Sequence, residues 1–121
     1  MVKTTAKEQK KINDCLRLLS NNYRVDINTI RLSVANTLEH ELAKTIKAYE
    51  LIKDGNQIVT EAVFKGGGRA DILCLNKFQV FEILHSETKK KALRKLDTYP
   101  KELTIFFIDS SEQIDRYGDG I

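Results

Sequence analysis

The order of the expected secondary-structure elements predicts an α/β fold, a three-layer sandwich with helices on both faces of a mixed sheet of about four strands. Four short segments are rich in β-branched and aromatic residues and are bounded by glycine, asparagine or proline. Apolar residues recur at helical spacing before the first of them. A helix-forming segment between the third and fourth allows the crossover that makes these two strands parallel. The expected order is α-α-β-β-β-α-β.

Two helices are expected before the sheet. Residues 5–20 have helical spacing of apolar residues, and the sequence SNNYR ends this pattern. Residues 26–55 are expected to form a longer helix, with Asp26 as its N-cap and Gly55 at its end. We expect one apolar stripe of this helix to pack on the sheet. The stripe contains Ile27, Val34, Leu38, Leu42, Ile46, Tyr49 and Ile52.

The remaining elements follow from alternation and from turn residues. Strands are expected at residues 57–64, 70–75, 78–84 and 103–109. Asn76 and Lys77 predict a two-residue hairpin turn between the second and third strands. Residues 86–99 are expected to form a helix with Ser86 as its N-cap, and Pro100 ends it.

The chain of 121 residues is expected to form one domain, 1–121. An N-terminal helix and its connection occupy residues 1–25, the core occupies residues 26–109, and residues 110–121 form a polar, partly disordered tail. No apolar stretch approaches the length of a membrane span, and the first residues lack a signal-peptide pattern, so we expect an intracellular protein with no membrane partner. The two cysteines, Cys15 and Cys74, are expected to be buried free thiols.

Two acids lie in the expected hairpin, Asp71 on one strand and Glu82 on the next. If Asn76 and Lys77 form the turn, Leu75 faces Phe78 and Asp71 lies directly opposite Glu82. Residues at paired positions have Cβ atoms about 4.5–5.5 Å apart, and like charges there are destabilising. Such a pair suits a divalent cation with oxygen ligands, Mg²⁺ or Mn²⁺. The alternative is a structural ion pair between one acid and Arg69 or a lysine of the later helix.

The arrangement resembles the PD-(D/E)XK nuclease superfamily, in which one strand carries an acid, the next carries Glu-x-Lys, and a helix with a glutamate precedes them. Here Asp71 ends RAD, Glu82 begins EIL, and the sequence LEHEL supplies the helix. The resemblance spans roughly residues 37–109 and implies the restriction endonuclease-like fold, also found in Holliday junction resolvases of this superfamily. It implies Asp71 and Glu82 as metal ligands and catalytic residues.

The sequence departs from the pattern at Leu84, where the motif lysine is expected. Some branches of the superfamily supply this lysine from the following helix, and Lys95 is our candidate. Lys95 and Tyr99 lie four residues apart, on one helix face. The resemblance implies that Lys95 positions or deprotonates the attacking water, or neutralises the phosphate. The alternative is that Lys95 is one solvated lysine among several.

Other acids and bases are assigned around this pair. Glu39 and Glu41 flank the apolar stripe about equally, and either could reach the metal. We select Glu39 as the third metal ligand and catalytic residue, while Glu61 is a further acid near the site. His40 is expected to be exposed. The glycines of residues 65–69 either form a mobile turn or admit a sugar-phosphate backbone. The predicted nucleic-acid contacts are Lys65, Gly67, Arg69, Lys89, Lys90 and Arg94.

The sequence therefore predicts a Mg²⁺- or Mn²⁺-dependent nuclease that hydrolyses phosphodiester bonds. The net charge of +3 and the two basic clusters permit a polyanionic partner, and we expect DNA rather than RNA. A chain of this size leaves little room for a target-recognition domain. We therefore expect cleavage of branched DNA structures rather than cleavage at a specific sequence, and we expect a homodimer that presents two sites to two strands. The alternative is a nucleic-acid-binding module that kept the fold and lost the chemistry, which Leu84 favours.

Overall fold

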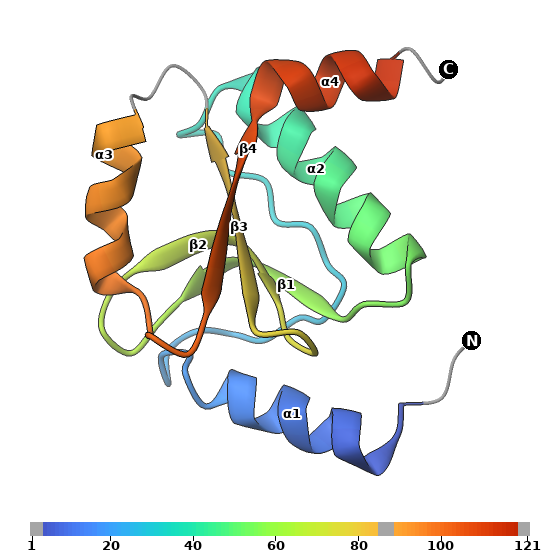
Figure 1. Cartoon of the computed structure of the whole chain (residues 1–121), viewed down its shortest axis with the longest axis vertical. Helices are drawn as coiled ribbons and strands as arrows, with labels where there is room; N and C mark the ends of the chain where they lie inside the picture. Colours follow the sequence, from blue (N-terminus) through green and yellow to red (C-terminus); the bar gives the residue numbers. More distant parts are fainter. Residues whose placement is uncertain (1–3, 85–88, 119–121) are drawn as a thin grey trace.

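The computed structural model describes residues 4–84 and 89–118 and shows an α/β fold with an open, mixed, four-stranded sheet (Figure 1). The strands are β1 (Ile58–Val63), β2 (Arg69–Cys74), β3 (Gln79–Leu84) and β4 (Thr104–Asp109), in the spatial order β1-β2-β3-β4. β1, β2 and β3 are antiparallel neighbours, whereas β4 is parallel to β3. The predicted α/β class and the predicted parallel crossover are confirmed.

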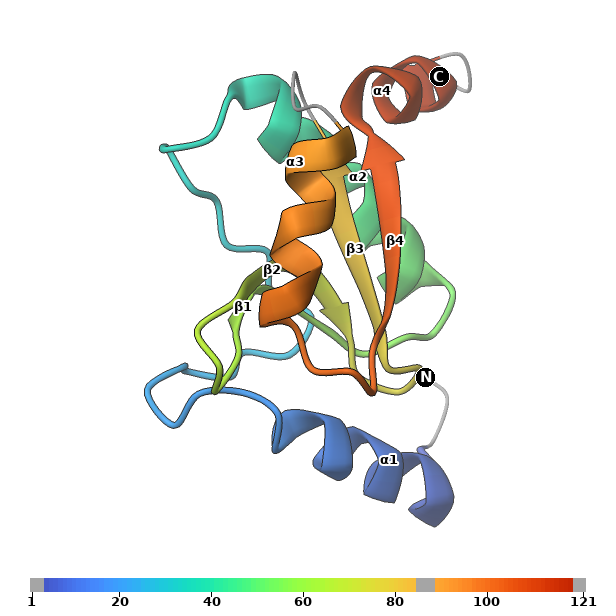
Figure 2. The same ribbon diagram turned by 60° about the vertical axis from the view of Figure 1, so that its left-hand side comes forward.

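Helices cover the two faces of the sheet. The first face carries α1 (Ala6–Leu16), whose Ile12 and Cys15 pack with Leu73 and Val80 of the sheet. The other face carries α2 (Leu38–Lys53), whose Ala48 and Leu51 pack with other residues of the strands. In Figure 2, α3 (Lys89–Arg94) lies on the side of the sheet away from α2. The chain continues from α3 into the short 3₁₀ helix η1 (Lys95–Thr98). Cys15 and Cys74 are buried free thiols, as predicted.

The register of the central hairpin agrees with the prediction, although its turn is longer. Ile72 pairs with Phe81, and Leu73 pairs with Val80, which are the predicted partners. The strands end earlier than expected, so residues 75–78 form the turn and Phe78 adopts φ 52°. The side chain of Asn76 accepts a hydrogen bond at 3.0 Å from the Gln57 backbone N–H, which ties the turn to the start of β1.

The long helix predicted for residues 26–55 is wrong over its first twelve residues. The helix begins after Thr37, whose hydroxyl accepts a hydrogen bond from the His40 backbone N–H at 3.1 Å, and Asp54 is its C-cap. The preceding segment has irregular structure, and it runs along the open edge of β1. There the Asn28 backbone N–H donates to the Ile58 carbonyl at 2.8 Å. These bonds to the sheet edge replace the helical bonds that the sequence pattern suggested.

The predicted apolar stripe of this helix is also wrong, because most of it faces solvent. Leu38 and Tyr49 are 84% and 51% exposed, and Val34 is fully exposed. The buried face of α2 instead contains small and ionisable side chains. Its members are His40, Glu41, Ala43, Lys44, Ile46, Ala48 and Leu51. Because polar groups of the sheet lie beneath the first half of the helix, the buried face there is polar as well.

The predicted polar tail is a helix, α4 (Ser110–Gly118), which packs along α2 (Figures 1 and 2). Glu50 of α2 accepts hydrogen bonds from Gln113 Nε2 at 3.0 Å and from Arg116 Nη2 at 3.0 Å. The predicted disorder of residues 110–118 is therefore wrong. The sequence showed few apolar residues there, and these polar bonds to α2 supply the packing instead. The predicted N-cap, Ser86, lies outside the described residues.

Among the described residues, no helix has the length and the apolar character needed to cross a membrane.

Candidate active site

The site begins at a kink shared by β1 and β2. Val59 and Ala62 both face the α1 side of the sheet although they are three residues apart, and so do Ala70 and Leu73. In a regular strand, residues three apart face opposite sides. The reversal occurs at Glu61, which has φ 50°, and at the opposing Asp71; both are skipped in the pairing of the two strands. The kink therefore turns the carboxylates of Glu61 and Asp71 away from the directions that they would have in regular strands.

The β2–β3 ladder ends at the same place. The last paired residues are Ile72 and Phe81, so Asp71 and Glu82 lie just beyond them. Glu61, Asp71 and Glu82 thus stand in one row across three strands. The sequence predicted the facing of Asp71 and Glu82. It did not predict the kink, because nothing in the local pattern requires a positive φ at Glu61.

A cavity of about 340 Å³ lies beside this row. Six of the predicted site residues line it: Glu61, Arg69, Asp71, Glu82, Lys95 and Tyr99. They come from β1, β2, β3, η1 and the residue that follows η1, so residues separated by up to 38 positions meet in one place. Residues of the irregular segment before α2, Ser33 and Asn36 among them, form another wall.

Asp71 and Glu82 share one proton over much of the accessible pH range. Burial and the neighbouring Asp71 charge raise the pKa of Glu82 to about 9. Burial also acts to raise the pKa of Asp71, but hydrogen bonds from His40, Glu82 and the Ile83 backbone N–H hold it below its ordinary value. The Ile83 N–H lies 2.8 Å from Asp71 Oδ2. Glu82 is buried and Asp71 is partly buried, and two such adjacent carboxyl groups that retain a proton form a site that a cation can occupy in its place.

Tyr99 connects Glu82 with the start of β2, next to the β1–β2 turn that contains the glycines of residues 66–68 (the glycine hairpin). Its hydroxyl lies 2.7 Å from the Arg69 carbonyl oxygen and donates to Glu82 Oε1. Its ring packs edge-on against Phe64 with centroids 5.4 Å apart. These contacts hold Glu82 from the side of the sheet opposite α2.

Lys95 lines the cavity and is the candidate to replace the motif lysine, which the sequence lacks at Leu84. It lies in η1 rather than in α3, and Tyr99 follows that 3₁₀ turn, so the predicted α-helical i, i+4 pair is wrong in its geometry although both residues line the cavity. The positive charge of Lys95 acts to lower the pKa of Glu82 against the effect of burial. Leu84 ends β3 and does not line the cavity.

Three residues that sequence reasoning missed or misplaced come from α2. His40, predicted to be exposed, is 9% exposed, and its Nε2 lies 3.3 Å from Asp71 Oδ2. Its Nδ1 lies 2.7 Å from Glu41 Oε2, and Lys44 Nζ donates to Glu41 Oε1 at 2.7 Å. The bond to Asp71, helped by that to Glu41, raises the pKa of His40. The i, i+4 spacing of His40 and Lys44 was the available signal, but the apolar stripe outweighed it.

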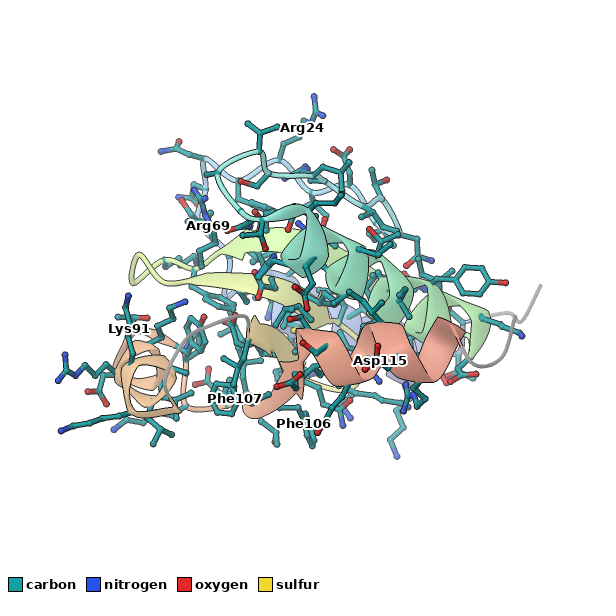
Figure 3. All side chains as sticks on the ribbon, turned by 90° about the horizontal axis from the view of Figure 1, so that it is seen from above. Arg24, Arg69, Lys91, Phe106, Phe107 and Asp115 are labelled. Atoms are coloured by element: carbon teal, nitrogen blue, oxygen red, sulfur yellow. The ribbon has the colours of Figure 1, made fainter. Side chains whose placement is uncertain are left out.

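The remaining predicted residues lie outside the cavity lining. Glu39 points toward α4, where its Oε1 accepts a hydrogen bond from the Ser111 hydroxyl at 2.9 Å, so it does not join Asp71 and Glu82. Glu41 is buried and reaches Asp71 only through His40. Lys65, Gly67, Lys90 and Arg94 are exposed, and Lys89 begins α3. In Figure 3, Arg69 of β2 and Lys91 of α3 lie on the same side of the view, away from Asp115 of α4.

Gly68 tests the close contact between the β1–β2 turn and η1. A Cβ at this position would meet Thr98 Oγ1 at 2.6 Å and the Thr98 carbonyl oxygen at 2.7 Å. At Gly66 the nearest such atom is 3.6 Å away, an ordinary contact. We expect Gly68→Ala to lower the free energy of unfolding by about 1–3 kcal/mol because η1 must move.

Gly66→Ala is the matched control, and we expect it to change the free energy of unfolding by less than about 0.5 kcal/mol. Urea unfolding of both variants measures the difference. Equal stabilities of the two variants would show that the hairpin and η1 are not in close contact.

No protein-family model matches this sequence, and no curated protein or solved structure is significantly similar to it. The functional argument therefore depends on the geometry of the chain itself. Among the residues that the structure describes, no group of three or more His, Cys, Asp or Glu side chains is arranged to hold a metal ion.

Proposed function

We propose that this protein is a metal-dependent nuclease with a PD-(D/E)XK core, acting on DNA. The observation that carries the proposal is the meeting of Asp71, Glu82 and Lys95 at one cavity. The order of helix α2, three antiparallel strands, helix and parallel fourth strand agrees with the restriction endonuclease-like arrangement that the sequence resemblance implies.

The donor set fits Mg²⁺ or Mn²⁺. Mg²⁺ is commonly held by only one or two protein carboxylates together with water and substrate phosphate, so a third acidic ligand is not required. Asp71 is partly buried beside the buried Glu82, and the raised pKa of Glu82 keeps a proton on this pair, which supports replacement of that proton by a cation. When bound, the ion would activate a water and stabilise the charge that develops on the phosphate.

The basic residues have separate roles in this proposal. Lys95 and Arg69 line the cavity and supply positive charge for the phosphate at the reacting position. Lys95 also orients the attacking water, which replaces the function of the motif lysine. The exposed Lys90 and Arg94 of α3, together with Lys65 of the hairpin, bind neighbouring phosphates and set the position of the strand.

The direct test is cleavage of linear, single-stranded and branched DNA by the purified protein with Mg²⁺, Mn²⁺ or EDTA. We expect metal-dependent products from the wild-type protein and at least a roughly 100-fold loss of rate for Asp71→Ala and Lys95→Ala. Asp97→Ala, which removes an exposed acid of η1 outside the cavity lining, is the control and should cleave at the wild-type rate.

The alternative function, a nucleic-acid-binding module without catalysis, is favoured by Leu84. It predicts DNA binding that falls with salt concentration but no cleavage, and binding that Asp71→Ala leaves undiminished. That combination of results would overturn the nuclease proposal. Analytical ultracentrifugation with and without branched DNA tests the predicted homodimer in the same samples.

A further inference from the structure

The chain of contacts from α2 to Asp71 gives a specific role to a residue outside the resemblance. His40 is held between two carboxylates, Asp71 on β2 and Glu41 on its own helix, at 3.3 and 2.7 Å. Because both ring nitrogens face carboxylate oxygens, the doubly protonated ring satisfies both contacts. The ring orientation is therefore fixed from both ends.

Glu41 is in turn held from several directions. Its Oε1 accepts hydrogen bonds from Lys44 Nζ at 2.7 Å and from the Ser33 backbone N–H at 2.5 Å, and its Oε2 lies 3.3 Å from Asn36 Nδ2. Lys44 is fully buried and also donates to the Arg31 carbonyl oxygen at 2.7 Å. Glu41 is therefore a fixed partner for the His40 ring.

The contact with His40 restricts how Asp71 can act. Asp71 Oδ2 already faces His40 Nε2 and the Ile83 backbone N–H. Asp71 also shares a hydrogen bond with Glu82, so Oδ1 would meet a cation or a reacting phosphate once the cation replaces the proton of that bond. A carboxylate fixed through one oxygen presents the other in a defined direction, which is how residues behind a ligand raise its affinity for a metal.

We infer that His40 is a positioning residue that holds Asp71 in a single orientation, with Oδ1 presented to the metal, and that Glu41 and Lys44 hold His40. This inference rests on the proposed function, because it assigns the metal to Asp71. In this role His40 acts through Asp71 and does not touch the metal. Glu39, the acid that the sequence favoured on the same helix, takes no part.

The test is a double-mutant cycle on Mn²⁺ affinity, measured by electron paramagnetic resonance with the purified full chain. We expect His40→Ala to weaken Mn²⁺ binding about 10- to 100-fold. In an Asp71→Ala background the same change should alter the affinity less than about two-fold, because its route to the metal is gone. His40→Gln, which keeps a donor, should recover part of the lost affinity, and Glu41→Gln should weaken binding by a smaller factor.

Tyr49→Gln on the outer face of α2 is the control for general damage to the helix, and we expect wild-type affinity. If folding limits any variant, urea unfolding without metal gives the same cycle between His40 and Asp71 as a coupling of stabilities.

The outcomes separate the inference from the proposed function. Wild-type Mn²⁺ binding that His40→Ala leaves within two-fold would overturn the inference alone. An equal fold-loss from His40→Ala with and without Asp71 would also overturn it, and would make His40 an independent ligand. No Mn²⁺ binding by the wild-type protein would overturn both the inference and the nuclease proposal.

Discussion

Replacing Lys44 with methionine is expected to lower the free energy of unfolding by about 3–5 kcal/mol, since one partner of a buried ion pair is removed. Lys44 is fully buried, and its amine bonds the Glu41 carboxylate and the Arg31 carbonyl oxygen. Glu61 Oε1 lies 3.9 Å away. Methionine fills similar volume but donates no hydrogen bond, so the buried Glu41 carboxylate loses its lysine partner and the partly buried Arg31 carbonyl oxygen loses the donor at 2.7 Å.

This loss is large relative to the total stability of a small domain, about 5–15 kcal/mol. Lys47→Met is the matched control on the next turn of α2. The Lys47 side chain is 22% exposed, and its amine lies 4.0 Å from Glu50, so we expect a change below about 1 kcal/mol. The double variant Glu41→Gln with Lys44→Met should lose less free energy of unfolding than the two single variants lose in sum. Chemical denaturation measures the wild-type protein and the four variants, and a loss below about 1 kcal/mol for Lys44→Met would contradict the buried pair.

The metal-free protein is expected to lose stability as the pH rises from about 4.5 towards 9. The pKa of Glu82 is raised to about 9 in the folded protein, whereas its ordinary value is 4.5. Between these values the folded state holds a proton that the unfolded state releases, so the unfolded state is favoured as the pH rises. One proton corresponds to a slope of at most about 1.4 kcal/mol per pH unit. The raised pKa of His40 acts in the same direction above its ordinary value of 6.5.

Urea unfolding in EDTA at several pH values measures this slope. Glu82→Gln replaces the carboxyl group with a neutral side chain of similar shape, so the slope should become much shallower. Asp97→Ala should leave it unchanged, because Asp97 is exposed and outside the cavity. A wild-type stability that rises over this range would show that Glu82 is ionised in the folded protein without metal.

The central hairpin shows how far local sequence pattern can reach. Asp71 and Glu82 were placed opposite each other from the turn position alone, and the register of Ile72 with Phe81 agrees. This succeeded although the turn is longer than expected, because adding one residue to each side of a hairpin loop keeps the same partners opposite each other. The fourth strand was predicted for a similar reason: its pattern of apolar residues is local.

Helix α2 shows where local pattern fails. The sequence has a genuine apolar stripe through Leu38 and Tyr49, yet the fold leaves these residues exposed and buries His40 and Lys44. A helical period identifies a face but does not say which face meets the sheet. Here the answer depended on Asp71, which lies 31 positions after His40 and is brought beneath it by the kink of β1 and β2.

The sequence by itself determined the α/β class, the strand order along the chain and the β2–β3 register that brings Asp71 next to Glu82, because each depends on periodicity or on a turn between neighbouring segments. Tertiary structure decided which helix face is buried, that residues 110–118 form α4, and that His40 rather than Glu39 reaches Asp71. The physical reason is that buried charges are placed by partners far away in the chain, and the cost of burying them is offset only after those partners have met.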